Sequence, residues 1–147
     1  MPYYPDAQRE YPSRPLVGVG AVIVSHGRVV LVRRGRAPAL GEWSIPGGLV
    51  HVGERLRDAV VREGLEETGL IIEPGDLIEL VERIFPDPDG RIRFHYVVAD
   101  YLCCVKGGNL RPSSDALDAA WFRREDLEQL GICRAMMRVL SAALGRT

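Results

Sequence analysis

The strongest constraint on the fold is the pattern of apolar residues over residues 54–68, which has the period of a helix and stops at Gly69. This period predicts a helix, and glycine is a common residue just beyond a helix end. Three carboxylates occupy its last turns: Glu63, Glu66 and Glu67. They share one face of the helix, at the end where the helix dipole disfavours negative charge. The pattern therefore indicates either a solvated acidic face or a site for a cation.

The residues before the helix favour the cation site. Carboxylate oxygens, with no sulfur or histidine among them, suit Mg²⁺, or Mn²⁺ as the second choice. The preceding segment, PGGLVHVGE over residues 46–54, contains glycines that let backbone groups approach a ligand. Glu54 and Arg62 are separated by about two helical turns, so they can face the same side and form an ion pair.

Flanking patterns predict a mixed sheet around this helix. Apolar or alternating runs predict strands at residues 16–24, 28–34, 77–85, 91–105 and 118–122. A stretch rich in glycine and proline predicts that residues 35–48 are mostly loop, and helices are predicted at 124–130 and 133–144. This order favours an α/β fold of the mixed α+β kind, in which helices cover both faces of a mixed sheet.

Length and charge bound the organisation of the chain. Its 147 residues suffice for one domain, which we expect to span residues 16–147. Residues 1–15 hold four prolines and three tyrosines, and they are expected to form an extended arm. The formal net charge of −1 argues against a nucleic-acid partner. No apolar stretch approaches about 18 residues, so no membrane span is expected.

The cysteines bear on the compartment. The chain has three of them, Cys103, Cys104 and Cys133, two of which are adjacent within an apolar run. An odd number with this spacing is not typical of a disulfide framework or a zinc site. The sequence therefore predicts buried free thiols and a cytoplasmic protein.

The stretch from Gly48 to Leu70 resembles the Nudix box, the signature of the Nudix hydrolase family. The matching residues are Gly48, Glu54, Arg62, Glu63, Glu66, Glu67, Gly69 and Leu70. The similarity in element order extends over residues 16–130 and implies the Nudix-type α-β-α sandwich. Gly64 departs from the pattern, because the family usually has an aliphatic residue there. A glycine at this position would allow close packing against a strand.

This resemblance implies a reaction and a set of catalytic residues. Nudix enzymes hydrolyse a nucleoside diphosphate linked to another moiety, and they use divalent metals, here Mg²⁺ or Mn²⁺, to activate water. The implied metal ligands are the side chains of Glu63, Glu66 and Glu67 and the carbonyl of Gly47. Glu54 and Arg62 would form the supporting ion pair.

Further candidates lie outside the box. The family often adds an acidic residue on a later loop as a general base or a metal ligand. Asp115 is the candidate here, with Asp118 as the second choice. Arg33 and Arg34 end a predicted strand and are candidates for substrate binding, since Arg34 matches an arginine that meets substrate phosphate in MutT-type members.

The resemblance leaves three functions open. Pro86, placed 16 positions beyond Leu70, resembles ADP-ribose-cleaving members, so ADP-ribose or a similar nucleoside diphosphate sugar is the favoured substrate. The first alternative is a MutT-like pyrophosphohydrolase of nucleoside triphosphates, including oxidised ones. The second is a nucleotide-binding Nudix module without catalysis, in which degenerate box carboxylates would be expected. Many relatives are homodimers, and the arm could serve that purpose here.

Overall fold

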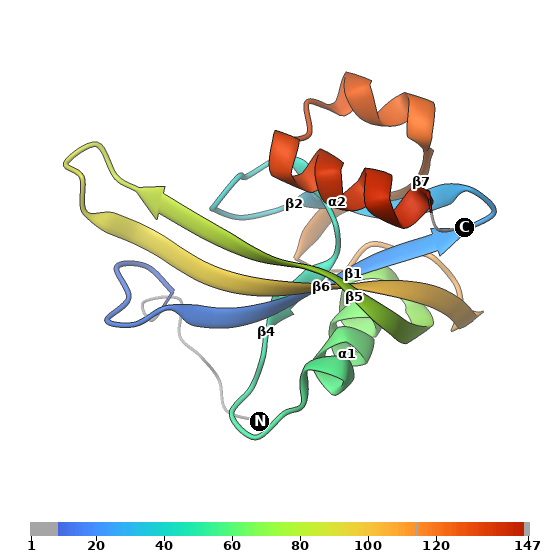
Figure 1. Cartoon of the computed structure of the whole chain (residues 1–147), viewed down its shortest axis with the longest axis horizontal. Coiled ribbons are helices and arrows are strands. Elements are labelled where there is room, and N and C mark those ends of the chain that lie inside the picture. Colours follow the sequence, from blue (N-terminus) through green and yellow to red (C-terminus); the bar gives the residue numbers. More distant parts are fainter. Residues whose placement is uncertain (1–8, 114, 146–147) are drawn as a thin grey trace.

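A twisted, mixed β-sheet with helices on both faces forms the domain (Figure 1). The computed structural model describes residues 9–113 and 115–145. The strands are β1 (Leu16–Ser25), β2 (Arg28–Arg34), β3 (Trp43–Ser44), β4 (Gly47–Leu49), β5 (Leu70–Pro86), β6 (Ile92–Gly108) and β7 (Ala116–Arg123). The helices are α1 (Leu56–Thr68), the 3₁₀ helix η2 (Arg124–Leu130) and α2 (Arg134–Leu144). The predicted mixed fold with helices on both faces is confirmed.

Strand β1 organises the sheet because it has partners on both of its edges. It pairs in parallel with β6 from Leu16 opposite Tyr96 to Ile23 opposite Cys103. It also pairs antiparallel with β2 and with the short strand β4. β2 in turn pairs with β3 and β7. This arrangement brings β4, which directly precedes α1, onto the central strand.

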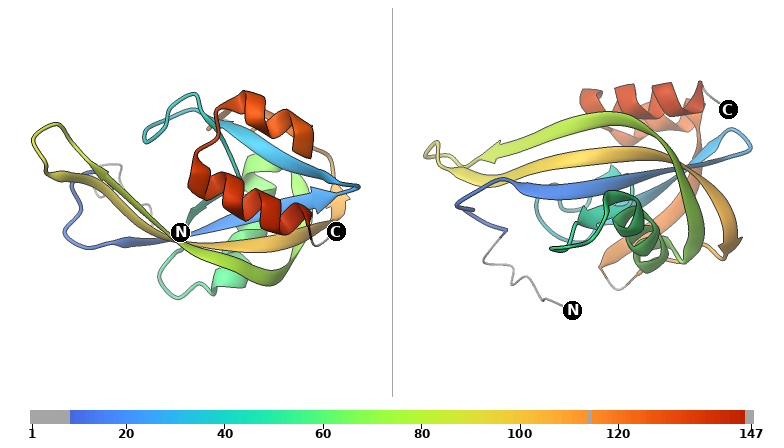
Figure 2. Two further views of the ribbon diagram at one scale, coloured as in Figure 1. Left: turned by 45° about the horizontal axis from the view of Figure 1, so that its top comes forward. Right: turned by 60° about the horizontal axis from the view of Figure 1, so that its bottom comes forward.

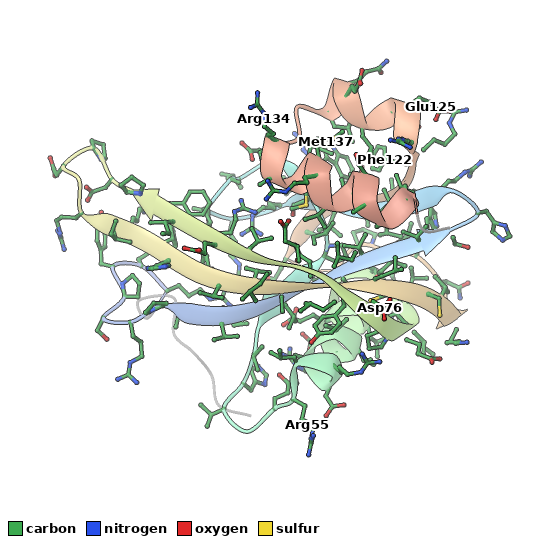
Figure 3. The ribbon with its side chains drawn as sticks, in the orientation of Figure 1. Arg55, Asp76, Phe122, Glu125, Arg134 and Met137 are labelled. Carbon is green, nitrogen blue, oxygen red and sulfur yellow. The ribbon has the colours of Figure 1, made fainter. Side chains whose placement is uncertain are left out.

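Each face of the sheet has its own hydrophobic core. Val19, Ala21 and Ile23 of β1 are buried toward α1, whereas Val22 and Val24 are buried in the cluster that includes α2. The alternation follows from the strand period of two residues. Figure 2 shows α1 and α2 on opposite sides of the sheet. Arg55, just before α1, and Arg134, at the start of α2, point to solvent (Figure 3).

Gly64 packs α1 against the sheet as predicted. A Cβ at this position would overlap the side chain of Ile72 on β5. The close approach of helix and strand offsets the entropic cost of a glycine inside a helix. Gly69 has a φ of 75° and ends α1 in the left-handed conformation, so the predicted stop is also confirmed.

Strands β5 and β6 form a hairpin longer than the sequence predicted, extending beyond the rest of the sheet (Figure 2). The prediction began the first strand at residue 77, but β5 begins at Leu70. The register shifts between Pro74 and Leu77. Proline has no N–H to donate to the neighbouring strand, so the hydrogen-bond pattern of β5 is interrupted near Pro74. The sequence on either side of the interruption therefore resembled a loop followed by a separate strand.

Three smaller expectations were met only in part. The predicted loop at 35–48 contains β3 and the start of β4, which are two and three residues long and too short to show a period. Residues 124–130 form a 3₁₀ helix. Of the three free cysteines, Cys103 is buried, but Cys104 and Cys133 are exposed. Cys104 follows Cys103 directly in β6, so its side chain faces the opposite side of the sheet.

The described part of the arm contacts the β5–β6 hairpin. The Tyr11 N–H donates to the Arg93 carbonyl at 2.7 Å, and the Tyr11 hydroxyl donates to Asp87 at 2.9 Å. Glu10 pairs with Arg93 at 3.1 Å. Residues 1–8 of the predicted arm lie outside the described residues. Within the described ranges, no helix is long and apolar enough to cross a bilayer.

Candidate active site

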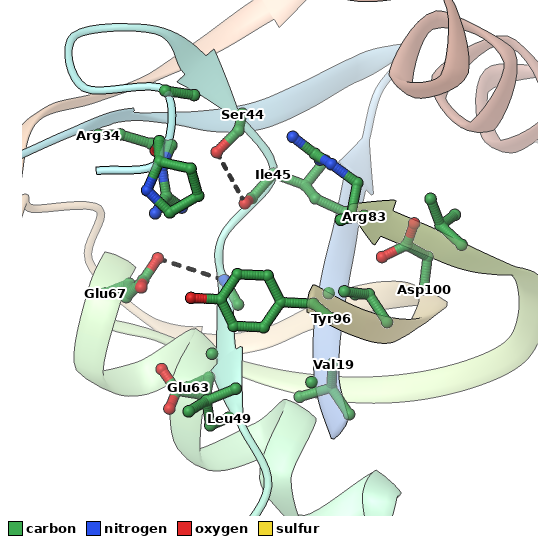
Figure 4. A pocket seen from close by; sticks show the side chains of 18 of the residues that line it. Val19, Arg34, Ser44, Ile45, Leu49, Glu63, Glu67, Arg83, Tyr96 and Asp100 are labelled. Atoms are coloured by element: carbon green, nitrogen blue, oxygen red, sulfur yellow. Dashed lines mark hydrogen bonds between the residues drawn. The ribbon is translucent and has the colours of Figure 1, made fainter. Parts of the chain in front are cut away.

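A cavity of about 590 Å³ lies between the end of α1, strand β4, the β5–β6 hairpin and α2 (Figure 4). The charged residues that line it include Arg9, Arg34, Arg36, Arg62, Arg83, Glu42, Glu63, Glu66, Glu67, Asp100 and Asp115. Its apolar lining includes Val19, Ile45, Val81, Val98, Met136 and Val139. Concave sites with apolar walls and a few polar groups are typical of small-molecule binding.

Arg62 is the centre of a charged cluster that includes Glu54, Glu63 and Glu66. Its Nε donates to Glu54 at 2.7 Å and its second terminal nitrogen donates to the same carboxylate at 2.9 Å, which is the predicted ion pair. The guanidinium also donates to the Leu49 carbonyl at 3.0 Å. Arg62 therefore ties α1 to both β4 and the loop before the helix. This bonding lowers the pKa of Glu54 to about 2.

The three box glutamates do not share one environment. Glu63 and Glu67 are largely buried, whereas the side chain of Glu66 is 55% exposed. Arg62 donates to Glu63 at 2.8 Å and to Glu66 at 3.2 Å. Glu67 accepts the backbone N–H of Gly47 at 3.2 Å (Figure 4).

Burial leaves the inner glutamates with uncompensated negative charge. Desolvation raises the pKa of Glu63, although Arg62 opposes the shift. Desolvation and the nearby charge of Glu63 raise the pKa of Glu67 to about 7. A carboxylate has such a pKa when its charged form lacks sufficient partners. A cation in this position would supply the missing positive charge.

Two glycines of β4 make room for this cluster. A Cβ on Gly48 would overlap the carboxylate of Glu63, and a Cβ on Gly47 would overlap the carbonyl of Val19 on β1. The backbone therefore runs directly against the Glu63 carboxylate and the central strand. This close approach explains why the sequence has two glycines before the helix.

The residues present fit a divalent cation only in part. The buried oxygens of Glu63 and Glu67 are suitable hard ligands, and their raised pKa values indicate a charge that a cation would neutralise. Within residues 9–113 and 115–145, however, no three His, Cys, Asp or Glu side chains lie together in a way that could hold a metal ion. Glu66 is instead directed to Arg62. Glu66 also lines the cavity, so the carboxylates of Glu63 and Glu67 and the more exposed one of Glu66 are all available there.

The predicted residues outside the box lie in different places. Arg34 lines the cavity and donates from Nε to the Pro38 carbonyl at 2.6 Å. Arg33 is exposed, donates to the Gly41 carbonyl at 3.0 Å and does not line the cavity. Asp115 lies at the rim, 3.9 Å from Arg36. Asp118 is outside the lining.

Several lining residues were not found from the sequence. Arg9 comes from the arm, and Arg83, Tyr96 and Asp100 come from the β5–β6 hairpin. Asp100 had a recognisable signal, because it is the one carboxylate within the otherwise apolar run VVADYLCCV. Burial and Glu79 raise its pKa to about 7, while Arg83 lowers it.

Comparisons with known proteins agree on one family. The family described as "NUDIX domain" matches residues 14–141 of the chain. An ADP-ribose pyrophosphatase of Methanocaldococcus jannaschii is 34% identical over 116 residues, which are 79% of this chain and 66% of that protein. The chain thus spans slightly less than two thirds of this relative's length.

Solved structures give the same result. A MutT NUDIX hydrolase from Burkholderia pseudomallei has a TM-score of 0.70 and 34% identity, covering 88% of this chain and 98% of its own. An ADP-ribose pyrophosphatase from Streptococcus suis has a TM-score of 0.68 and 26% identity, and the match covers 90% of this chain and 92% of the Streptococcus suis chain.

Proposed function

Because the chain belongs to the Nudix family of hydrolases, we propose that it hydrolyses the pyrophosphate bond of ADP-ribose or a similar nucleoside diphosphate sugar, using Mg²⁺. The observation that carries this proposal is that Glu63, which is buried, and Glu67, which is partly buried, line a cavity that is also lined by arginines. Guanidinium groups match phosphate oxygens in geometry and charge. The names of the archaeal and streptococcal relatives support ADP-ribose as the substrate.

We assign the metal to Glu63, Glu66 and Glu67, with the Gly47 carbonyl as a further ligand and Asp115 at the rim as a candidate ligand or base. When bound, a divalent metal neutralises phosphate oxygens and lowers the pKa of water. Arg62 positions the ligands, because it contacts Glu63 and Glu66 as well as Glu54.

The arginines of the cavity are assigned to the substrate. Arg34 is partly buried beside the glutamates, where it would bind phosphate oxygens and hold the diphosphate in place. Arg33 was predicted to share this role, and its exposed position makes it the weaker candidate. The free thiols of the chain support a reducing compartment such as the cytoplasm.

A MutT-like activity is the second candidate. It is favoured by the Burkholderia structure, which is 34% identical to this chain and is covered by the match over 98% of its own length. Such an enzyme would hydrolyse nucleoside triphosphates, including oxidised ones. A binding module without catalysis is less well supported, since every carboxylate of the box is present in this chain.

Product analysis separates these functions. Incubation with ADP-ribose and Mg²⁺ should give AMP and ribose 5-phosphate, and excess EDTA should abolish the reaction. A nucleoside triphosphate panel serves as the comparison, read by chromatography. Nucleoside monophosphate with inorganic pyrophosphate as the dominant products would favour the MutT-like function instead. Binding of either ligand without turnover at any metal concentration would leave only the binding module.

The close contact between Gly48 and Glu63 gives a second prediction. Gly48→Ala should displace the Glu63 carboxylate and lower kcat by about 10- to 100-fold, because small misplacements of a ligand are costly. Circular dichroism should show a folded protein, since the overlapping group is the end of a side chain that can move. Gly107→Ala is the matched control, as its Cβ would meet only Ile71 carbons, 3.6 Å or more away. Equal kcat in both variants would argue against a role for Glu63.

A further inference from the structure

Asp100 on β6 is the least expected residue of the cavity. It is 3% exposed, and its Oδ1 has no hydrogen-bond partner among the described residues. Buried polar groups are nearly always hydrogen-bonded, because an unpaired one costs free energy. An unpartnered carboxylate oxygen in the wall of a binding cavity therefore needs an explanation.

The fold makes room for this carboxylate instead of excluding it. Asp100 lies opposite Gly20 on β1, where a Cβ would overlap its carboxylate. On its other side Asp100 pairs with Glu79 of β5. Glu79 pairs through Oε1 with Arg138 of α2 at 3.0 Å, and its Oε2 is also buried without a hydrogen-bond partner among the described residues. An ionised carboxylate only accepts hydrogen bonds, so Glu79 in that form supplies no donor to Asp100. The neighbouring strands thus leave Asp100 an acceptor without a donor.

The surroundings indicate what kind of group could supply the donor. Asp100 belongs to the part of the cavity that is lined by Ile45, Val81, Met136 and Val139, and Figure 4 shows it with Ile45 and Arg83. A sugar carries several hydroxyl groups that these apolar walls would leave unpaired. A nucleobase has apolar faces and a polar edge, which matches apolar walls with one polar residue.

We propose that Asp100 determines base specificity by accepting a hydrogen bond from an exocyclic amino group of the nucleobase, such as the 6-amino group of adenine. The terminal torsion of an aspartate is broad, so either carboxylate oxygen can turn toward the ligand. This inference rests on the proposed function, in which the diphosphate binds at the glutamates and the base occupies the apolar part of the same cavity. Burial raises the pKa of Asp100 to about 7, and a hydrogen bond donated by a ligand N–H would favour its ionised form.

A matched substrate pair tests this role. ADP-ribose is compared with its analogue that carries unsubstituted purine, which lacks the amino group. In the wild-type protein the loss of this group should lower kcat/KM by about 10- to 100-fold, since the buried acceptor is left unpaired. In Asp100→Leu the kcat/KM values of the two substrates should differ by less than threefold. Asp100→Asn keeps an acceptor oxygen and should retain most of the preference.

Stability and a control variant complete the kinetic test. Asp100→Leu removes a buried, unpartnered carboxylate, so its Tm should equal or exceed that of the wild type. Asp89→Leu, in the exposed hairpin turn, is the control and should keep the wild-type preference. Equal use of both substrates by the wild-type protein would overturn the proposal, even if Asp100→Leu fails to fold. An undiminished preference in a folded Asp100→Leu protein would also overturn it.

A binding measurement separates this inference from the proposed function. Calorimetric titration compares AMP with purine riboside 5′-monophosphate, and it needs no turnover. Discrimination that is lost in Asp100→Leu supports the role of Asp100 even if ADP-ribose is not hydrolysed, in which case only the proposed substrate is wrong. Hydrolysis of ADP-ribose without discrimination between the two nucleotides refutes the role of Asp100 alone.

Discussion

Replacing Glu67 with glutamine is expected to lower kcat by about 10²- to 10³-fold while the protein stays folded. Glutamine keeps the shape of the side chain but removes the negative charge assigned to the metal. Glu67 is largely shielded from solvent and its charged form is disfavoured, so the neutral side chain should not reduce Tm. The measurements are initial rates at saturating ADP-ribose and a thermal melt of each protein.

Two controls keep this result interpretable. Glu128→Gln makes the same chemical change at an exposed position outside the cavity, and it should leave kcat unchanged. A magnesium titration should show that Glu67→Gln needs more metal for half-maximal activity. Wild-type rates in Glu67→Gln at limiting Mg²⁺ would remove Glu67 from the metal site.

The parts of this site that depend on neighbours along the chain were predictable from the sequence. Helix α1 follows from the period of its apolar residues and from Gly69 at its end. The Glu54–Arg62 pair follows from a separation of about two helical turns. The two glycines of β4 indicated a close approach of the backbone, although the partner that approaches Gly48 is a side chain of the helix itself.

The parts that depend on strand pairing were not predictable. Asp100 reaches the cavity because β6 pairs in parallel with β1, which places it beside Gly20. Arg83 of β5 lies opposite Tyr96 of β6, which also lines the cavity. The pattern of a strand shows which side chains lie on the same face of the sheet, but it does not show which of the two faces packs against α1.

The orientation of Glu66 depends on more than its spacing along the helix. Its spacing places it on the same helical face as Glu63, and the sequence therefore predicted that all three glutamates converge. In the structure Arg62 competes for its carboxylate at 3.2 Å. Helical spacing limits where a side chain can reach, but the choice between a cation and a nearby arginine depends on the charges present.

Replacing Arg62 with alanine is expected to reduce both stability and turnover. The change removes both hydrogen bonds from Arg62 to Glu54, whose side chain is only 15% exposed. The carboxylate keeps the backbone N–H of His51 at 3.1 Å but loses the charge of its partner. Breaking a buried ion pair from one side costs about 3–5 kcal/mol. Because Glu54 keeps the His51 N–H, we expect the low end of this range, a fall in Tm of roughly 10 °C for a domain of this size. Turnover should also fall, because Glu63 and Glu66 lose a positioning contact.

The double variant Glu54→Gln/Arg62→Ala tests whether the unpaired charge causes the loss. With both charges removed, the fall in Tm should be smaller than in Arg62→Ala alone. A double variant that is as unstable as Arg62→Ala would show that the arginine acts through its contacts with Leu49 and α1 instead of through Glu54.

The pH dependence of this variant follows from the pKa of Glu54. Its folded-state pKa is lowered from 4.5 to about 2, so the pair stabilises the protein fully above about pH 4.5 and the stabilisation is lost as the pH falls toward 2. The difference in unfolding free energy between wild type and Arg62→Ala should therefore be constant near neutral pH and shrink on acidification. Urea denaturation across this range measures it. A difference that stays constant down to pH 2.5 would mean that the ionised form of Glu54 contributes nothing to the pair, and the contact with the Leu49 carbonyl would then carry the stability assigned to Arg62.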